Sequence, residues 1–195
     1  MSINFSKTKV LNISFGRVPV TPIPSLENVT VLKILDLLFN DRLTWSDHFH
    51  SIVKKLSQRL YVLRILKPLL PHDQLVSVFI AIILSVMDYA SPVFLNCGSC
   101  LNSKLLSMCK RAFRIIHGFD VRRCDRCNIF DIEKRRKFLA LKLFRNALFS
   151  VDHILHNLLP HFSCRSNRLI LPHVRTTRRV ESFIFTCASL YNDSL

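Results

Sequence analysis

Residues 75–95 form a long apolar stretch, LVSVFIAIILSVMDYASPVFL, in which Asp88 is the only charged side chain. A helix that crosses a bilayer needs about this length, so the stretch permits a single membrane span. Asp88 would be costly in lipid, and Pro92 interrupts a helix. Asp73 and Gln74, just before the stretch, are typical of the N-terminal cap of an ordinary buried helix. We therefore expect a buried helix and no membrane partner, with a small single-pass membrane protein as the alternative.

The charge of the chain is strongly positive and unevenly distributed. Its 28 Lys and Arg against 13 Asp and Glu give a net charge of +15. Residues 1–100 contain ten basic and six acidic side chains, whereas residues 101–195 contain eighteen and seven. This balance favours a polyanionic partner that is contacted mainly by the second half. The three glycines, Gly16, Gly98 and Gly118, are far apart, which argues against a Gly-rich phosphate loop and thus against Rossmann-type or Walker-type nucleotide binding.

Three segments differ in their apolar pattern. Residues 1–45 predict short strands and turns, with one strand over 10–15 and a second, buried strand over 28–39. Residues 46–150 follow a helical period, and residues 151–195 form a basic extension with a short helix. The expected fold is therefore mainly α, with short N-terminal β-strands before a helical bundle.

The helical segment has recognisable boundaries. Thr44 and Asp47 are spaced as a capping box at its start, and Pro68 and Pro71 end the first helix. Further helices are expected over about 73–89, 101–117, 131–149 and 182–191. The inner stripe of the helix over 101–117 is predicted to consist of Leu101, Leu105, Cys109, Ala112 and Ile116.

Seven cysteines and a start without the apolar core of a signal peptide favour free thiols in a reducing compartment. Two CxxC pairs nevertheless have the spacing of a tetrahedral zinc site. Their members are Cys97, Cys100, Cys124 and Cys127. A second, weaker combination consists of His153, His156, His161 and Cys164. For both sets the alternative is partly buried thiols or a polar surface without metal.

The segment KRRKFLALKLFR, residues 134–145, is the best candidate for a nucleic-acid surface. At 100° per residue, four cations share one face with an aromatic ring. These residues are Lys134, Arg135, Phe138, Lys142 and Arg145. Arg122 and Arg123 lie just upstream and add to the charge density. The alternative is a solvated basic helix face.

Motifs of hydrolytic or phosphoryl-transfer enzymes are missing from the sequence. It contains no GxSxG and no HExxH, and no adjacent pair of aspartates that could hold two metal ions. Catalysis by this chain alone is therefore not expected.

Five segments in order resemble the C-terminal part of the reverse transcriptases of non-LTR (LINE, jockey-like) retrotransposons. Residues 4–11, NFSKTKVL, resemble the N-x-x-K-T-K segment, and residues 31–48 resemble the segment with L-x-W-x-x-H that forms the primer grip. Residues 87–94 are similar to a thumb helix that contains Tyr, and residues 110–118 to a basic R-x-x-R-x-I-x-G helix. Residues 183–192, FIFTCASLYN, resemble the closing Trp-Asn-x-Leu-Pro element.

The resemblance implies the end of a palm, with a primer-grip-like β segment, followed by an α-helical thumb. The parent activity would be RNA-directed DNA polymerisation, and the partners would be an RNA and DNA template–primer and the remaining palm and fingers. The family's Mg²⁺-binding aspartates precede the N-x-x-K-T-K segment, so we expect a partial, inactive polymerase with no cofactor of its own, located in the nucleus or cytoplasm. The matched positions that would contact nucleic acid are Lys7, Lys9, Lys110, Arg111 and Arg114.

The chain departs from the family pattern at three informative positions. Asp36 stands where the family has the Gly of an LG pair, Leu84 where relatives often have a basic residue, and Tyr191 where the family has Trp. These departures indicate a decayed or partial copy of an element. A zinc-stabilised nucleic-acid-binding module that uses the CxxC pairs is a further alternative.

Overall fold

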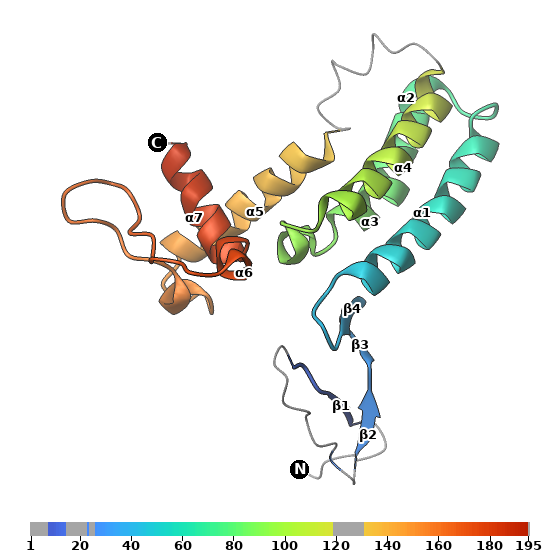
Figure 1. Cartoon of the computed structure of the whole chain (residues 1–195). Coiled ribbons are helices and arrows are strands. Elements are labelled where there is room, and N and C mark those ends of the chain that lie inside the picture. Colours follow the sequence, from blue (N-terminus) through green and yellow to red (C-terminus); the bar gives the residue numbers. More distant parts are fainter. Residues whose placement is uncertain (1–7, 15–22, 24–25, 119–130, 195) are drawn as a thin grey trace. The chain divides into compact units, whose positions relative to one another are not determined.

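The computed structural model describes residues 8–14, 23, 26–118 and 131–194 (Figure 1). The chain forms two compact units, Met1–Gln58 and Arg59–Leu195. The division falls inside the helix α1, Ser46–Leu66, and not at residue 45 or 150, where the sequence pattern changes. The expected mainly helical fold with short N-terminal strands is confirmed.

The first unit contains two pairs of short strands. β1 (Lys9–Leu11) pairs in parallel with β2 (Glu27–Val29), with Lys9 opposite Glu27. β3 (Val31–Ile34) and β4 (Leu37–Asn40) form an antiparallel hairpin. The prediction of one buried strand over 28–39 is therefore wrong: the chain reverses at Leu35 and Asp36, which both have positive φ, 48° and 65°. The turn itself contains no Gly or Asn, and a residue such as Leu35 adopts a positive φ only at some cost, so the apolar pattern hides the turn.

Asp36 is held in this turn by two lysines. Its carboxylate lies 2.6 Å from Lys33 Nζ and 2.5 Å from Lys55 Nζ. The hydrogen bonds from Lys33 and then from Lys55 lower the pKa of Asp36 to about 2. The charged side chain of Asp36 therefore ties the hairpin to α1, within the first unit.

Asn40, at the end of β4, organises the start of α1. Its Nδ2 donates to Thr44 Oγ1 at 2.6 Å and to Asp47 Oδ2 at 2.8 Å, and its Oδ1 accepts from the N–H of Thr44. Thr44 and Asp47 thus share a donor and do not form the predicted capping box, because the helix begins at Ser46. His48 is buried in this region, and the loss of solvent lowers the pKa of its imidazole.

The apolar stretch forms a continuous helical run in the second unit: α2 (His72–Phe79), a wider π-type turn η2 (Ile80–Leu84), and α3 (Ser85–Asp88). Pro71 precedes it and no side chain caps it, so the predicted cap by Asp73 and Gln74 is wrong. Buried side chains recur along one side, at Leu75, Phe79, Ile83 and Met87. Among the described residues, no helix combines the length and apolar character that a membrane crossing requires.

The remaining elements of the second unit lead to the C-terminal helix. After η3 (Ser91–Phe94) come α4 (Ser99–His117), α5 (Ile132–Phe149), η6 (His156–Leu158), α6 (Thr177–Val180) and α7 (Phe183–Asp193). α7 packs against α5 (Figure 1), and the Phe144 ring lies 6.4 Å from both Phe183 and Tyr191. The side-chain amide of Asn192 holds the loop before α6 through Leu169. Its Oδ1 accepts from the N–H of Leu169 at 2.8 Å, and its Nδ2 donates to the carbonyl of Leu169 at 3.1 Å.

Candidate nucleic-acid interface

α4 is an amphipathic helix with a basic outer face. Its inner stripe contains Leu105, Cys109, Ala112 and Ile116 as predicted, together with Met108 and Phe113, whereas Leu101 is half-buried. The outer side carries Lys104, Lys110, Arg111 and Arg114, all exposed. The helix contains no Asp or Glu. The outer face therefore combines several positive charges with no carboxylate of its own.

Six residues of α4 line a shallow depression along the outer face. They are Ser103, Leu106, Ser107, Lys110, Arg111 and Arg114. Their spacing of three and four residues places them side by side along the helix. Within the part of the chain that the structure describes, none of the three cations takes part in an ion pair. Cationic groups beside hydroxyls are the side chains that contact phosphate oxygens of nucleic acids. We call this set the α4 stripe.

Four of the six Lys and Arg side chains of α5 contact other groups of the protein. Asp131, the N-cap residue, accepts from the backbone N–H of Lys134 at 3.1 Å, and its other oxygen lies 3.3 Å from Lys134 Nζ. The backbone hydrogen bond is the main reason why the pKa of Asp131 is lowered. The guanidinium of Arg145 lies 5.8 Å from the Tyr191 ring and its Nη2 donates to Ser194 Oγ at 3.4 Å.

Arg135 forms the strongest of these contacts. Its Nε donates to both oxygens of Asp88, at 2.9 and 2.7 Å, and its Nη2 lies 2.6 Å from Oδ2. Arg135 was expected to face nucleic acid, yet it joins α5 to the end of α3. Of the predicted basic face, Lys134, Lys142 and Arg145 remain exposed, and the Phe138 side chain beside them is 65% exposed.

Arg136, which was not singled out from the sequence, is only 3% exposed. Its Nη1 donates to Asn102 Oδ1 at 2.7 Å and to Cys97 Sγ at 3.2 Å, and its guanidinium lies 5.3 Å from the centre of the Phe94 ring. The sequence contains a signal for this burial. Arg136 lies four residues after Ile132 and four before Ala140, both buried, and is therefore in register with the apolar stripe of α5.

The other predicted contact residues are dispersed. Lys9 is exposed at the first β pair and forms an ion pair with Glu27 at 3.0 Å. Lys7, Arg122 and Arg123 lie outside the described residues.

The predicted metal ligands are not brought together where the structure describes them. Cys97 is buried and donates to Asn102 Oδ1 at 3.0 Å, and burial raises the pKa of its thiol, whereas Cys100 is exposed. Cys124 and Cys127 lie outside the described residues. The described chain contains no group of three or more His, Cys, Asp or Glu that could hold a metal ion.

The second predicted set is engaged in local contacts. His153 Nδ1 accepts from the N–H of Leu155 at 3.1 Å, and His156 Nδ1 donates to the carbonyl of Ala147 at 3.0 Å. Cys164 is exposed. The imidazoles of His153 and His156 therefore hold the loop after α5, and within the described residues neither of them, nor His161, belongs to a cluster that could hold a metal ion.

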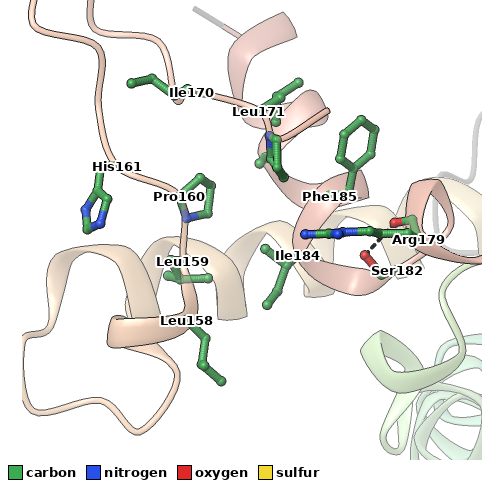
Figure 2. Close-up of a pocket in the computed structure, with 12 residues that line it drawn as sticks. Leu158, Leu159, Pro160, His161, Ile170, Leu171, Arg179, Ser182, Ile184 and Phe185 are labelled. Atoms are coloured by element: carbon green, nitrogen blue, oxygen red, sulfur yellow. Dashed lines mark hydrogen bonds between the residues drawn. The ribbon is translucent and has the colours of Figure 1, made fainter. Parts of the chain in front are cut away.

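A further hollow lies between α7 and the chain around Pro160, and Figure 2 shows its residues. Its lining is mostly apolar, with Leu159, Ile184 and Phe185 among the side chains drawn. Two polar residues, Ser182 and Arg179, also line the hollow, and Ser182 Oγ donates to the carbonyl of Arg179 at 2.7 Å. The apolar lining makes this hollow a poor match for phosphate groups and a better match for a hydrophobic ligand.

Comparisons with known proteins return no matching family model, no matching curated protein and no matching solved structure.

Proposed function

We propose that this chain is the palm end and thumb of a non-LTR retrotransposon reverse transcriptase, and that it binds the RNA and DNA template–primer through the sugar–phosphate backbone. Two independent facts support the proposal. The five resembling segments occur in the family's order along the chain. The order of elements, short strands and then helices, is the one that a palm end followed by a helical thumb requires.

The observation that carries the binding role is the α4 stripe. Lys110, Arg111 and Arg114 lie within the segment that resembles the family's basic thumb helix, and they are exposed without a carboxylate partner among the described residues. A cation that is not neutralised within the protein can replace counterions on a phosphate backbone, and this release drives binding. Such contacts follow the backbone and do not distinguish one base sequence from another.

α5 offers a second, weaker contact. Lys142 is exposed, and Phe138 presents a largely exposed ring one helical turn before it. An exposed aromatic ring next to cations can stack on an unpaired base, as in proteins that bind single strands. We assign this face a supporting role because Lys134 and Arg145 also contact groups of the protein.

The proposal assigns binding, and no step of nucleotide transfer, to the described residues. In the family two Mg²⁺ ions are held by aspartates that precede the segment matched by residues 4–11, and none of the matched positions supplies such a pair. The described residues likewise do not fit a two-metal site.

A filter-binding titration with an RNA–DNA duplex tests the binding role. Affinity is expected to fall steeply between about 50 and 200 mM salt, with a logarithmic slope of about −0.9 for each phosphate neutralised. Competition with duplexes of unrelated sequence should be equally effective. A slope near zero, or a strong preference for one sequence, would contradict backbone binding through the α4 stripe.

Primer extension tests the assignment as a partial polymerase. The purified chain, supplied with a template–primer, Mg²⁺ and deoxynucleoside triphosphates, is expected to add no nucleotides above a blank without protein. Incorporation that grows with protein concentration and survives further purification would overturn the assignment.

A further inference from the structure

The hollow between α7 and the chain around Pro160, which we call the Pro160 hollow, has a volume of about 400 Å³. Pockets that hold small ligands have volumes of about 300–1,000 Å³. Leu159 and Ala188, which line the hollow, belong to the buried core of the second unit. Leu158 and Ile170, which also line it, are 64% and 57% exposed. Apolar surface therefore continues from the core to the solvent, and a ligand that covered it would remove apolar area from water.

The backbone around the Pro160 hollow offers few hydrogen-bond donors. Pro160 and Pro172 both line it, and proline has no backbone N–H. The N–H of Ile170 already donates to the carbonyl of His161 at 2.9 Å. A ligand in the hollow therefore meets mainly side chains, and one of these side chains has to bind its polar group.

Arg179 gives the hollow its positive charge. Among the described residues that line the hollow, Arg179 is the only Lys or Arg, and none is Asp or Glu. Arg179 is exposed and forms no ion pair within the described ranges. Figure 2 shows its side chain directed into the hollow, toward Ile184, whereas His161 lies on the far side of Pro160 in this view. The hollow thus combines an apolar cavity with one guanidinium that no carboxylate of the lining balances.

We propose that the Pro160 hollow binds a monocarboxylate with an alkyl chain, with the carboxylate on Arg179 and the chain against the apolar lining. A guanidinium and a carboxylate can form two parallel hydrogen bonds. One guanidinium balances one negative charge, whereas a phosphate monoester carries about −1.5 to −2 at neutral pH. Binding here does not rest on the nucleic-acid role, because the described residues that line the hollow include none of α4.

Titration calorimetry on the full chain with octanoate, octan-1-ol and octylammonium tests the head group, because the three ligands share the same alkyl chain. We expect octanoate to bind one equivalent with a Kd of about 0.1 mM. Octan-1-ol, which lacks the charge, should bind about tenfold more weakly, and octylammonium should not bind measurably because its charge is repelled by Arg179. Equal binding of octanoate and octan-1-ol, or no saturable binding of octanoate, would overturn the proposal.

The length of the chain tests the contact with the apolar lining. Burying one methylene group tightens binding about threefold to fourfold. The Kd should therefore fall about tenfold from hexanoate to octanoate, and about tenfold again to decanoate. A Kd that does not change with chain length would assign the carboxylate to an exposed cation with the chain left in water, and would contradict binding in the hollow.

Arg179→Gln removes the charge while keeping a polar side chain. Because Arg179 is exposed, we expect the variant to fold as the wild type does, to bind octanoate about tenfold more weakly and to bind octan-1-ol unchanged. Arg175→Gln removes the same charge at an exposed position outside the lining and should leave both Kd values unchanged. Unchanged octanoate binding by Arg179→Gln, or equal losses in the two variants, would overturn the role of Arg179.

Phe185→Ala removes part of the apolar wall and leaves the charge in place. Phe185 lines the hollow and is half-buried. We expect the variant to bind octanoate and octan-1-ol more weakly by the same factor, about tenfold, because both ligands lose the same apolar contact. Unchanged binding of both ligands by folded Phe185→Ala would place the chain outside the hollow. If this variant does not fold, Arg179→Gln and the chain-length series decide.

Discussion

α4 and α5 are neighbours in the chain and are both rich in cations, but they use them differently. α5 contains six Lys and Arg and α4 contains four. On α5, Lys134 pairs with Asp131, Arg135 with Asp88, and Arg136 is buried. The cations of α4 have no such partner among the described residues. The number of cations in a segment is therefore a poor measure of the charge available to a ligand.

The cause of the difference lies in the surroundings of the two helices. α5 begins directly after Asp131 and faces Asp88 at the end of α3, so carboxylates meet it at its first turn. α4 contains no acidic residue, and its N-cap residue, Gly98, has no side chain that could cap the helix. Asp131 could be read from its spacing to Lys134, but Asp88 lies 47 residues from Arg135 and sequence spacing does not reveal it.

The largest effect is expected from neutralising the α4 stripe. Lys110→Gln, Arg111→Gln and Arg114→Gln combined should weaken binding of an RNA–DNA duplex on the order of a hundredfold at 0.1 M salt, and reduce the salt slope by about 2.7. Filter binding measures both. Lys54→Gln and Arg64→Gln on α1, together with Lys67→Gln just after it, change exposed positions, remove the same charge and serve as the control. Equal losses in the two triple variants would show that net charge alone matters.

A smaller effect is expected from the same change on α5. Lys134→Gln, Lys142→Gln and Arg145→Gln combined should weaken binding by about tenfold, because two of these side chains already contact the protein. The same filter-binding assay at 0.1 M salt compares the two helices directly. A loss larger than that of the α4 variant would reverse the order of the two faces.

Arg135 should matter for stability more than for binding. Arg135→Gln leaves the partly buried Asp88 without its charged partner and should lower the free energy of unfolding by about 1–2 kcal/mol. Urea unfolding followed by circular dichroism measures the change. Lys142→Gln, on the exposed face of the same helix, should stay within about 0.5 kcal/mol of the wild type. Indistinguishable midpoints for the two variants would remove the structural role of Arg135.

The smallest effect concerns the start of α5. Asp131→Ala removes the side-chain acceptor for the N–H of Lys134 and should cost about 1 kcal/mol at pH 7. Because folding lowers the pKa of Asp131 below its usual 3.8, this stabilisation is complete above that value. It is lost as the pH falls through the lower, folded-state pKa.

Urea unfolding at pH 7 and near pH 2 measures the difference between Asp131→Ala and the wild type, which should shrink in acid. Asp152→Ala, at an exposed position after α5, is the control and should change neither value. A difference that is the same at both pH values would show that the carboxylate does not act as the cap.

Local patterns predicted the helices well and the contacts between them poorly. The apolar period located α4 and α5 to within two residues, and proline positions marked the end of α1. The hairpin turn was missed because Asp36 is its only turn-favouring residue, and Leu35 beside it continues the apolar pattern. The partners of Arg135 and Arg136 lie more than thirty residues away in the chain, so no local spacing could indicate them.

The contact between Asn192 and Leu169 has a consequence for the order in which the molecule forms during translation. One side-chain amide supplies Leu169 with both the donor and the acceptor that a neighbouring strand would provide, and Leu169 is 3% exposed. The ribosome adds Asn192 only 23 residues after Leu169. Until then the loop before α6 lacks this fastening and the Phe144 side of α5 lacks the cover of α7, so apolar surface stays accessible to chaperones.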